Sequence, residues 1–149
     1  METPGARRAE LVPIVAVGGV VIAPGPRVLL IKRGAPPMLG QWTLPGGRLQ
    51  GGETIAAAIE REVFEETAIR VAAGSLIEVV EIMTEGYHYV VHDHLCTPVD
   101  AAEVPRPRDD AAEARYVLPS ELSSLGVTEA VTRVVRRGLA MRQLLNEDQ

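Results

Sequence analysis

Residues 47–69 read GRLQGGETIAAAIEREVFEETAI and carry the strongest structural signal in the chain. The apolar residues Ile55, Ile59 and Val63 are spaced i, i+4 and i+8, which is typical of one face of an amphipathic helix. The segment therefore predicts a helix over about residues 54–67. A glycine-rich turn precedes this helix, and its bare backbone can approach a ligand closely.

Three glutamates of this predicted helix fall on one side of it. A helix advances about 100° per residue, so Glu62, Glu65 and Glu66 lie within one arc of about 100°. Arg61, the only basic residue of the helix, can reach Glu65 at i, i+4 but leaves most of the negative charge unpaired. Positive charge from outside the helix is therefore expected, and carboxylate oxygens suit Mg²⁺ or Mn²⁺.

An ordinary solvated acidic face is the alternative interpretation of these acids. Such a face would lie opposite the apolar stripe and would include lysines, whereas these carboxylates flank the stripe. They also follow a loop that contains Gly46, Gly47, Gly51 and Gly52. Loops of this kind bring backbone groups up to an anion or a metal, so a ligand-binding helix is the better interpretation.

The segment resembles the Nudix box, in which Gly, five residues, Glu, seven residues, Arg-Glu, an aliphatic residue, any residue, Glu-Glu, any residue, Gly and an aliphatic residue follow in order. The matching positions are Gly47, Glu53, Arg61, Glu62, Val63, Glu65, Glu66 and Ile69. Ala68 stands where the family usually has glycine, and alanine costs about 1 kcal/mol if that position needs a positive φ. The flanking segments LLIKRG, WTLPGG and AAEARYVLPSEL also look Nudix-like, so the resemblance covers most of residues 14–122.

The resemblance implies a hydrolase in which acids of the box hold divalent cations on a substrate diphosphate. The implied metal-binding residues are Gly46, through its carbonyl, and Glu53, Glu62, Glu65 and Glu66. Glu53 either binds a second metal or pairs with Arg61, and Arg61 is expected to orient the acids rather than to contact substrate. Mg²⁺ is the expected metal, with Mn²⁺ as a substitute.

Two acids are candidates for the general base that activates the attacking water. Glu65 is one of them. Glu113 is the other, because the AAEARY segment resembles the place where several Nudix proteins carry a distal acid that serves as ligand or base. A solvent-facing carboxylate is an equally weighted alternative for Glu113. Together with Arg61, these two acids make up the expected catalytic set.

Candidates for substrate contacts are Lys32, Arg33, Trp42 and Tyr87. Lys32 and Arg33 end a predicted strand, where they either meet a phosphate or turn into solvent. Trp42 and Tyr87 either stack on a base or pack in the core.

The segment YHYVVHDHLC resembles small Nudix proteins grouped with ADP-ribose pyrophosphatases. Hydrolysis of ADP-ribose to AMP and ribose 5-phosphate is therefore the leading expectation. A nucleoside triphosphate pyrophosphohydrolase of the 8-oxo-dGTP type is the first alternative. A non-catalytic nucleotide sensor with the Nudix fold is the second.

The composition bounds the class of protein. A chain of 149 residues that is 46% hydrophobic suits a single domain over residues 1–149, with a core over about 12–145 and a flexible tail at 1–10. The single Cys96 excludes an intrachain disulfide, and no leader or membrane-spanning pattern is evident, so a cytoplasmic location is expected. The net charge of −5 argues against a nucleic-acid-binding surface. The expected partner is a small nucleotide, with pairing into a homodimer left open.

Apolar and alternating patterns predict strands at residues 12–22 and 27–32, within 70–83 and 87–97, and at 115–118. Residues 98–112 predict a long loop, and Thr128 is expected to cap a helix that runs to about Leu145. This order fits an α/β fold with a mixed sheet and helices on its faces. The resemblance sharpens that expectation to the Nudix α/β/α sandwich.

Overall fold

The computed structural model describes residues 11–148. The predicted flexible tail, residues 1–10, lies outside the described residues. Within the described part, no helix combines the length and the apolar character needed to cross a membrane.

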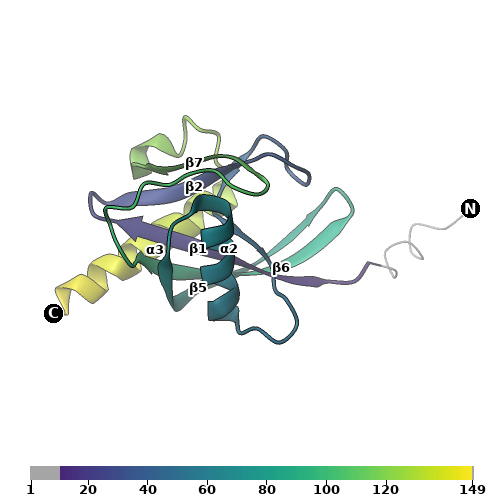
Figure 1. The fold of residues 1–149 in the computed structure, drawn as a ribbon, viewed down its shortest axis with the longest axis horizontal. Helices are drawn as coiled ribbons and strands as arrows, with labels where there is room; N and C mark the ends of the chain where they lie inside the picture. Colours follow the sequence, from purple (N-terminus) through teal and green to yellow (C-terminus); the bar gives the residue numbers. More distant parts are fainter. Residues whose placement is uncertain (1–10, 149) are drawn as a thin grey trace, which may run out of the picture.

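A mixed sheet of seven strands forms in the described part of the chain (Figure 1). The strands are β1 (Ile14–Ala23), β2 (Arg27–Arg33), β3 (Trp42–Thr43), β4 (Gly46–Arg48), β5 (Val71–Thr84), β6 (Tyr87–Pro98) and β7 (Ala111–Val117). Their order is β3-β2-β1-β6-β5, with β4 paired to β1 and β7 paired to β2. β1 runs parallel to β6, and the other pairs are antiparallel.

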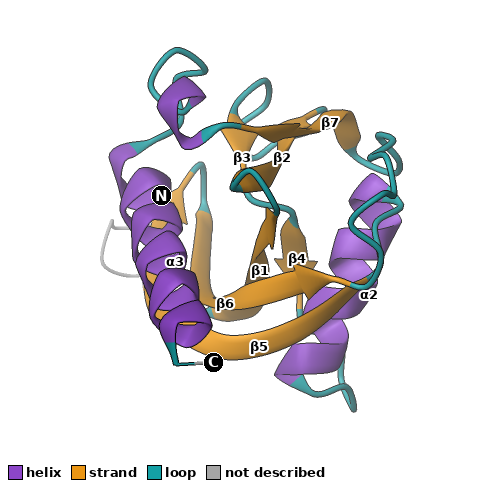
Figure 2. Ribbon diagram, turned by 90° about the vertical axis from the view of Figure 1, so that its left-hand side faces the viewer, coloured by secondary structure: helices purple, strands orange, loops and turns teal. Residues whose placement is uncertain are grey.

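Two long helices flank the sheet, α2 (Ile55–Thr67) and α3 (Glu129–Glu147), and Figure 2 shows them on opposite sides. A short 3-10 turn, η1 (Pro119–Glu121), precedes α3. Alternate residues of β1 point to opposite faces, so Val21 packs with Ile59 of α2 whereas Val20 packs with Val134 of α3. This arrangement confirms the mixed sheet between helices that the sequence predicted.

Both ends of α2 are capped. The hydroxyl of Thr54 accepts a hydrogen bond from the backbone N–H of Ala57 (3.1 Å) at the start of the helix. At its end, Ala68 has a φ of 63°, and its N–H donates to the carbonyl of Phe64 (2.9 Å). The residue that replaces the usual glycine therefore does adopt the left-handed conformation, at a cost of about 1 kcal/mol relative to glycine.

Three strands differ from the sequence-based prediction. β3 and β4 were not predicted, because two or three residues are too few to show an alternating pattern. β7 begins at Ala111, inside the predicted loop over residues 98–112, and ends at Val117. Its backbone pairing with β2, rather than its own apolar alternation, extends it toward the amino-terminal side.

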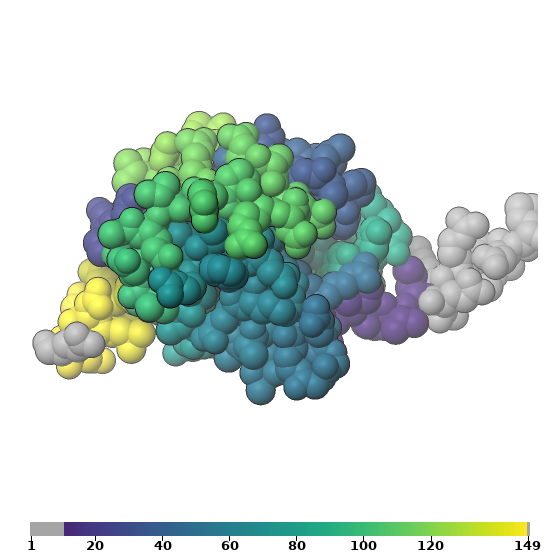
Figure 3. All heavy atoms as spheres, viewed as in Figure 1, coloured from purple at the N-terminus to yellow at the C-terminus, as the bar shows by residue number. Residues whose placement is uncertain are grey.

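The segment before β7 lies along the carboxyl-terminal end of α2. The N–H of Arg106 donates to the carbonyl of Thr67 (2.9 Å), and the N–H of Arg108 donates to that of Glu66 (3.0 Å). These bonds satisfy carbonyls that have no partner within the helix. In Figure 3 the green surface of this segment lies directly against the blue surface of α2, and this contact sets the position of Asp109 and Asp110.

Candidate active site

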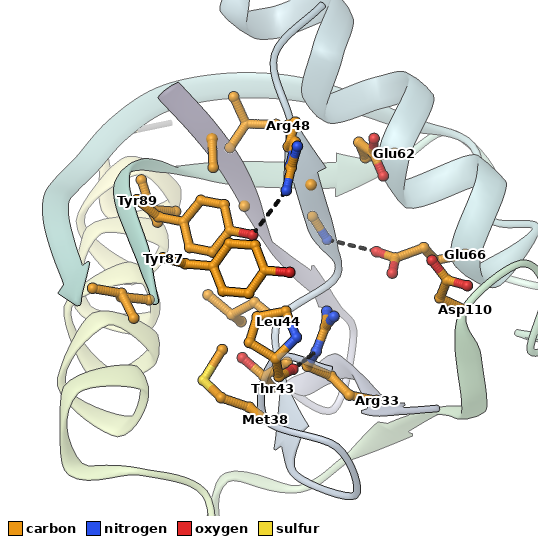
Figure 4. Close-up of a pocket in the computed structure, with 18 of the residues that line it drawn as sticks. Arg33, Met38, Thr43, Leu44, Arg48, Glu62, Glu66, Tyr87, Tyr89 and Asp110 are labelled. Atoms are coloured by element: carbon orange, nitrogen blue, oxygen red, sulfur yellow. Dashed lines mark hydrogen bonds between the residues drawn. The ribbon is translucent and has the colours of Figure 1, made fainter. Parts of the chain in front are cut away.

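A pocket of about 670 Å³ lies between α2 and the strands β1, β4 and β6 (Figure 4). Its volume falls within the usual range of small-molecule binding sites. Of the residues predicted from the sequence, its lining includes Arg33, Gly46, Glu62, Glu66 and Tyr87. The pocket therefore joins two acids of the box to candidate substrate contacts from distant parts of the chain.

Glu66 is the most buried acid of the box, with 5% of its surface exposed. Its Oε1 accepts a hydrogen bond from the N–H of Gly46 at 2.7 Å, so β4 fixes the carboxylate. Burial raises the pKa of Glu66 to about 8, against smaller lowering effects of the Gly46 bond and the charge of Arg33. At neutral pH the protein alone therefore favours the protonated form of Glu66, and the carboxylate form needs an added positive charge.

Glu62 faces the same strand one residue further along. A Cβ on Gly47 would collide with the Glu62 carboxylate, so any other residue there would displace the acid from its present position. Burial also raises the pKa of Glu62, although Arg61 acts in the opposite direction. The glycines of β4 therefore hold one carboxylate by a hydrogen bond and admit the other by their missing side chain.

Arg61 connects the remaining acids of the box. Its guanidinium donates to Glu53 (Nη2 to Oε1, 2.6 Å; Nε to Oε2, 3.0 Å) and, through Nη1, to Glu62 (2.8 Å) and Glu65 (3.2 Å). The bond to Glu53 makes the largest contribution to a raised pKa of Arg61. Arg61 therefore contacts three acids of the box at once, and Glu53 pairs with Arg61, which is one of the two roles considered for it from the sequence.

The carboxylates fit a hard divalent cation. Glu66 keeps its Oε2 outside the bond to Gly46, and Glu62 keeps its Oε2 outside the bond to Arg61. In the described part of the chain, no three His, Cys, Asp or Glu side chains already converge into a closed metal site. The donors are all carboxylate oxygens, two of them desolvated, and such oxygens suit Mg²⁺ or Mn²⁺ better than softer metals.

Two further acids, Asp109 and Asp110, line the pocket and were not predicted. The negative charge of Asp109 contributes to the raised pKa values of Glu62 and Glu66, so its carboxylate lies within electrostatic range of both. Figure 4 shows Asp110 beside Glu66. In the sequence, these residues are only a pair of acids in a proline-rich loop. They reach the pocket because that loop packs against the end of α2.

Three residues predicted to contact substrate or to act in catalysis lie away from the pocket: Glu113, Lys32 and Trp42. Glu113 lies on β7 opposite Lys32 of β2, and the two side chains form an ion pair at 3.6 Å with 54% and 39% of their surfaces exposed. Trp42 is 8% exposed in the core that includes Leu44, with the guanidinium of Arg115 at 4.9 Å from its ring centre. None of the three is among the described residues that line the pocket.

Glu65 also lies outside that lining, and its side chain is 42% exposed next to Arg61. Arg33, in contrast, lines the pocket, and its guanidinium donates to the carbonyls of Pro36 and Pro37. Those bonds fix the side chain against its own loop and keep positive charge near Glu66.

Tyr87 forms part of an aromatic wall. Its ring stacks on that of Tyr89, with the ring centres 5.4 Å apart and the planes 9° from parallel. The guanidinium of Arg48 lies 5.9 Å from each ring centre, within cation–π range. The wall combines flat apolar surface with a positive charge, which suits the organic part of a phosphorylated ligand.

A buried carboxyl, Asp93, lines the same pocket from β6 and was not predicted. It is 6% exposed, and burial raises its pKa to about 7, with the negative charge of Glu78 acting in the same direction. The sequence offers little signal for it, because Asp93 stands between His92 and His94 in a strand of mixed polarity, and only the fold buries it.

The sequence model of the NUDIX domain family matches residues 12–137 of the chain. This range contains every acid of the box and the strands β1, β4 and β6 that border the pocket. This chain belongs to the Nudix family. Nudix proteins act on small nucleotides and generally use divalent metal ions. The family match therefore agrees with the carboxylate chemistry of the pocket.

Among curated Nudix relatives, a "MutT-like protein" of Streptomyces ambofaciens is 36% identical over 109 residues, which are 73% of this chain and 66% of that protein. An "ADP-ribose pyrophosphatase" of Methanocaldococcus jannaschii is 43% identical over 72 residues, 48% of this chain and 42% of that protein. A "Putative 8-oxo-dGTP diphosphatase 2" of Mycobacterium tuberculosis is 44% identical over 59 residues, which are 39% of this chain and 41% of that protein. The matched region thus spans from 41% to 66% of the length of these relatives.

Solved Nudix structures share the fold. The crystal structure of a MutT NUDIX hydrolase from Burkholderia pseudomallei superposes with a TM-score of 0.70 and 27% identity, over 85% of this chain and 98% of that chain.

Proposed function

We propose that this Nudix protein is a Mg²⁺-dependent pyrophosphohydrolase that cleaves the diphosphate of a nucleoside diphosphate derivative, with ADP-ribose as the leading substrate. The observation that carries the proposal is the placement of Glu62 and Glu66, two desolvated carboxylates, in one pocket with Arg33. Desolvated like charges gain most from a divalent cation, and a diphosphate supplies the oxygens that complete the shell of Mg²⁺.

Different residues would hold the cation, orient its ligands and bind the phosphate. Free oxygens of Glu62 and Glu66, with the Gly46 carbonyl, would hold the cation, whereas Glu65, also predicted as a ligand, lies outside the pocket lining. When bound, the cation supplies positive charge to the diphosphate oxygens and to the attacking water. Arg61 keeps its acids in fixed orientations, and Arg33, which also lines the pocket, would offer positive charge to a phosphate.

The proton of the attacking water needs an acceptor. Glu65 and Glu113 are the candidates from sequence, but neither is among the described residues that line the pocket. Asp109 and Asp110 do line it, and the loop that carries them is anchored on α2. We therefore assign the general base to this pair of aspartates.

Two features support ADP-ribose over a triphosphate. The pocket continues from the acids to the wall of Tyr87 and Tyr89, so organic groups have surface to bind on the far side of the diphosphate. The matching region of the Methanocaldococcus relative belongs to a protein named for ADP-ribose. The Mycobacterium relative, named for 8-oxo-dGTP, favours the second candidate, a nucleoside triphosphate pyrophosphohydrolase.

A substrate panel with product identification tests the proposal. ADP-ribose, dinucleotides, canonical nucleoside triphosphates and 8-oxo-dGTP are incubated with the protein and Mg²⁺ in ¹⁸O-water, and products are separated by chromatography. We expect AMP and ribose 5-phosphate from ADP-ribose at the highest kcat/KM of the panel, with one ¹⁸O in one phosphate product. Pyrophosphate released from 8-oxo-dGTP at a higher kcat/KM supports the second candidate instead. Tight binding without products under Mg²⁺ or Mn²⁺ indicates a sensor.

A further inference from the structure

Asp93 is a buried acid with no hydrogen-bond partner for its carboxyl among residues 11–148. It is 6% exposed, and no side-chain hydrogen bond in the described part of the chain involves its carboxyl. The nearest charge that acts on it is another acid, Glu78, which is itself bonded to Arg133 and Arg137 of α3. Buried polar groups are almost always hydrogen-bonded, so an unpartnered carboxyl at a pocket surface indicates a missing ligand group.

The strand geometry directs this carboxyl into the pocket. Side chains alternate along β6, so Asp93 shares the pocket face with Tyr87, Tyr89 and Val91, which also line the pocket. Gly18 lies opposite Asp93 in the parallel register of β1, and a Cβ there would collide with the carboxyl. The missing side chain of Gly18 therefore makes the room that Asp93 occupies.

The surroundings of Asp93 suit a flat heterocycle better than a sugar. Ala16 and Val91, which lie opposite each other two residues along β1 and β6 from Gly18 and Asp93, line the pocket and are apolar. A ribose carries several hydroxyls and would leave most of them without partners here, at a cost for each unpaired group. A nucleobase presents two apolar faces to such walls and confines its polar atoms to its edge.

The protonation state of the Asp93 carboxyl determines which nucleobase it can pair with. With its pKa raised to about 7 by burial, the Asp93 carboxyl is partly protonated near neutral pH. A protonated carboxyl offers an O–H donor beside a C=O acceptor, which is the same pair that an Asn amide offers. Adenine matches that pair with an amino group next to a ring-nitrogen acceptor, and Asn is a common bidentate partner of adenine. Guanine offers two adjacent donors on its pairing edge and would prefer an ionised carboxylate.

We propose that Asp93 determines nucleobase specificity, with its carboxyl making a two-point hydrogen bond to the amino-bearing edge of an adenine that lies against Ala16 and Val91. This inference rests on the proposed function in one respect, because it takes the pocket beside Glu62 and Glu66 as the substrate site. It adds to that function the placement of the substrate. The adenosine half binds toward Asp93, and the distal ribose binds toward Tyr87 and Arg48.

Product binding measured by calorimetry with Mg²⁺ tests the placement without requiring turnover. AMP, GMP and ribose 5-phosphate are titrated into the wild-type protein and into Asp93→Asn and Asp93→Leu. We expect the wild type to bind AMP at least tenfold more tightly than GMP. Asp93→Asn should keep AMP affinity within threefold because the amide retains the donor and the acceptor. Asp93→Leu, nearly equal in shape, should weaken AMP at least tenfold and leave ribose 5-phosphate within twofold.

His92→Leu is the matched control, since it makes a polar-to-leucine change one residue away on the opposite face of β6. It should leave all three affinities within twofold. Gly18→Ala offers a second route to the same test, because its Cβ would push the carboxyl away, and it should weaken AMP as Asp93→Leu does. Circular dichroism of each variant checks that the fold is retained.

Equal loss of AMP and ribose 5-phosphate in Asp93→Leu overturns the placement of the base. Wild-type GMP affinity above that of AMP, abolished by Asp93→Asn, overturns the assignment to adenine. The failure of the proposed function is a separate result, because it shows as no hydrolysis of ADP-ribose. The expected AMP pattern would in that case still support Asp93 as the base-recognition residue.

Discussion

Replacing Glu66 with Gln separates the function of this carboxylate from its effect on stability. Burial makes the ionised form of Glu66 less favourable, and the pKa measures this free-energy cost. The pKa rises from an ordinary 4.5 to about 8. That difference corresponds to an upper bound of about 5 kcal/mol, at about 1.4 kcal/mol per pKa unit. Local relaxation and water entry reduce such costs, so we expect a measured effect of about 2 kcal/mol.

The sign follows from proton linkage. The folded state binds the Glu66 proton more tightly than the unfolded state, so stability is highest below pH 4.5 and falls as the pH rises toward 8. Glutamine is uncharged throughout and retains an oxygen to accept the N–H of Gly46. Glu66→Gln should therefore be about 2 kcal/mol more stable than the wild type at pH 8.5 without metal, and nearly equal to it at pH 4.5.

Urea denaturation in EDTA at the two pH values measures this difference. With Mg²⁺ restored, the same variant should lose at least a hundredfold in turnover, because a carboxamide is a poor ligand for Mg²⁺. Glu60→Gln is the matched control, since Glu60 lies on the same helix but is exposed and bonds the N–H of Ala73. It should change neither quantity appreciably. A Glu66→Gln protein that is no more stable at pH 8.5, or that turns over within threefold of the wild type, would refute this reasoning.

Five further substitutions test other parts of the molecule. Asp109→Asn or Asp110→Asn should lower kcat at least tenfold with little change in KM, whereas Glu113→Gln should change kcat less than threefold; the reverse pattern in steady-state kinetics would assign the base to β7. Ala68→Gly should raise the free energy of unfolding by about 0.5 to 1 kcal/mol by relieving the left-handed conformation, with unchanged activity; no gain in urea denaturation would mean that unfolded-state entropy cancels it. Arg61→Lys should lower stability by about 1 to 2 kcal/mol, since lysine lacks the planar fork. Thermal melts should show Mg²⁺ restoring part of that loss, and equal losses with and without Mg²⁺ would contradict the shared role of Arg61 and the cation.

The sequence predicted those parts of the molecule in which local pattern and tertiary structure agree. The helix α2 was predicted closely, because its apolar spacing, its Thr54 cap and its acids all lie within one short segment. The contact of Arg61 with Glu65 was predicted by helical spacing alone. The departure from the family pattern at Ala68 raised the question of a positive φ there, and the structure answers it with a φ of 63°.

The missed features depend on contacts between distant segments. Asp109 and Asp110 have a role only because the loop before β7 hydrogen-bonds the end of α2. Asp93 reaches the pocket because β6 pairs in parallel with β1, whose Gly18 leaves space for it. Neither pairing leaves a periodic signal in a single sequence. Glu113 illustrates the reverse, because its place in a family-like segment suggested a catalytic role that its pairing with Lys32 does not support.

The distribution of positive charge explains why a cation would act at one end of the box rather than across all of it. Arg61 donates to Glu53, Glu62 and Glu65, so the protein already neutralises much of their charge. Glu66 receives only a backbone N–H and the more distant charge of Arg33, and it is also the most buried of these acids. A divalent cation therefore gains most electrostatic energy at Glu66 and the free oxygen of Glu62, which both face the pocket. This asymmetry directs the metal, and with it the diphosphate, toward Arg33 and the tyrosine wall.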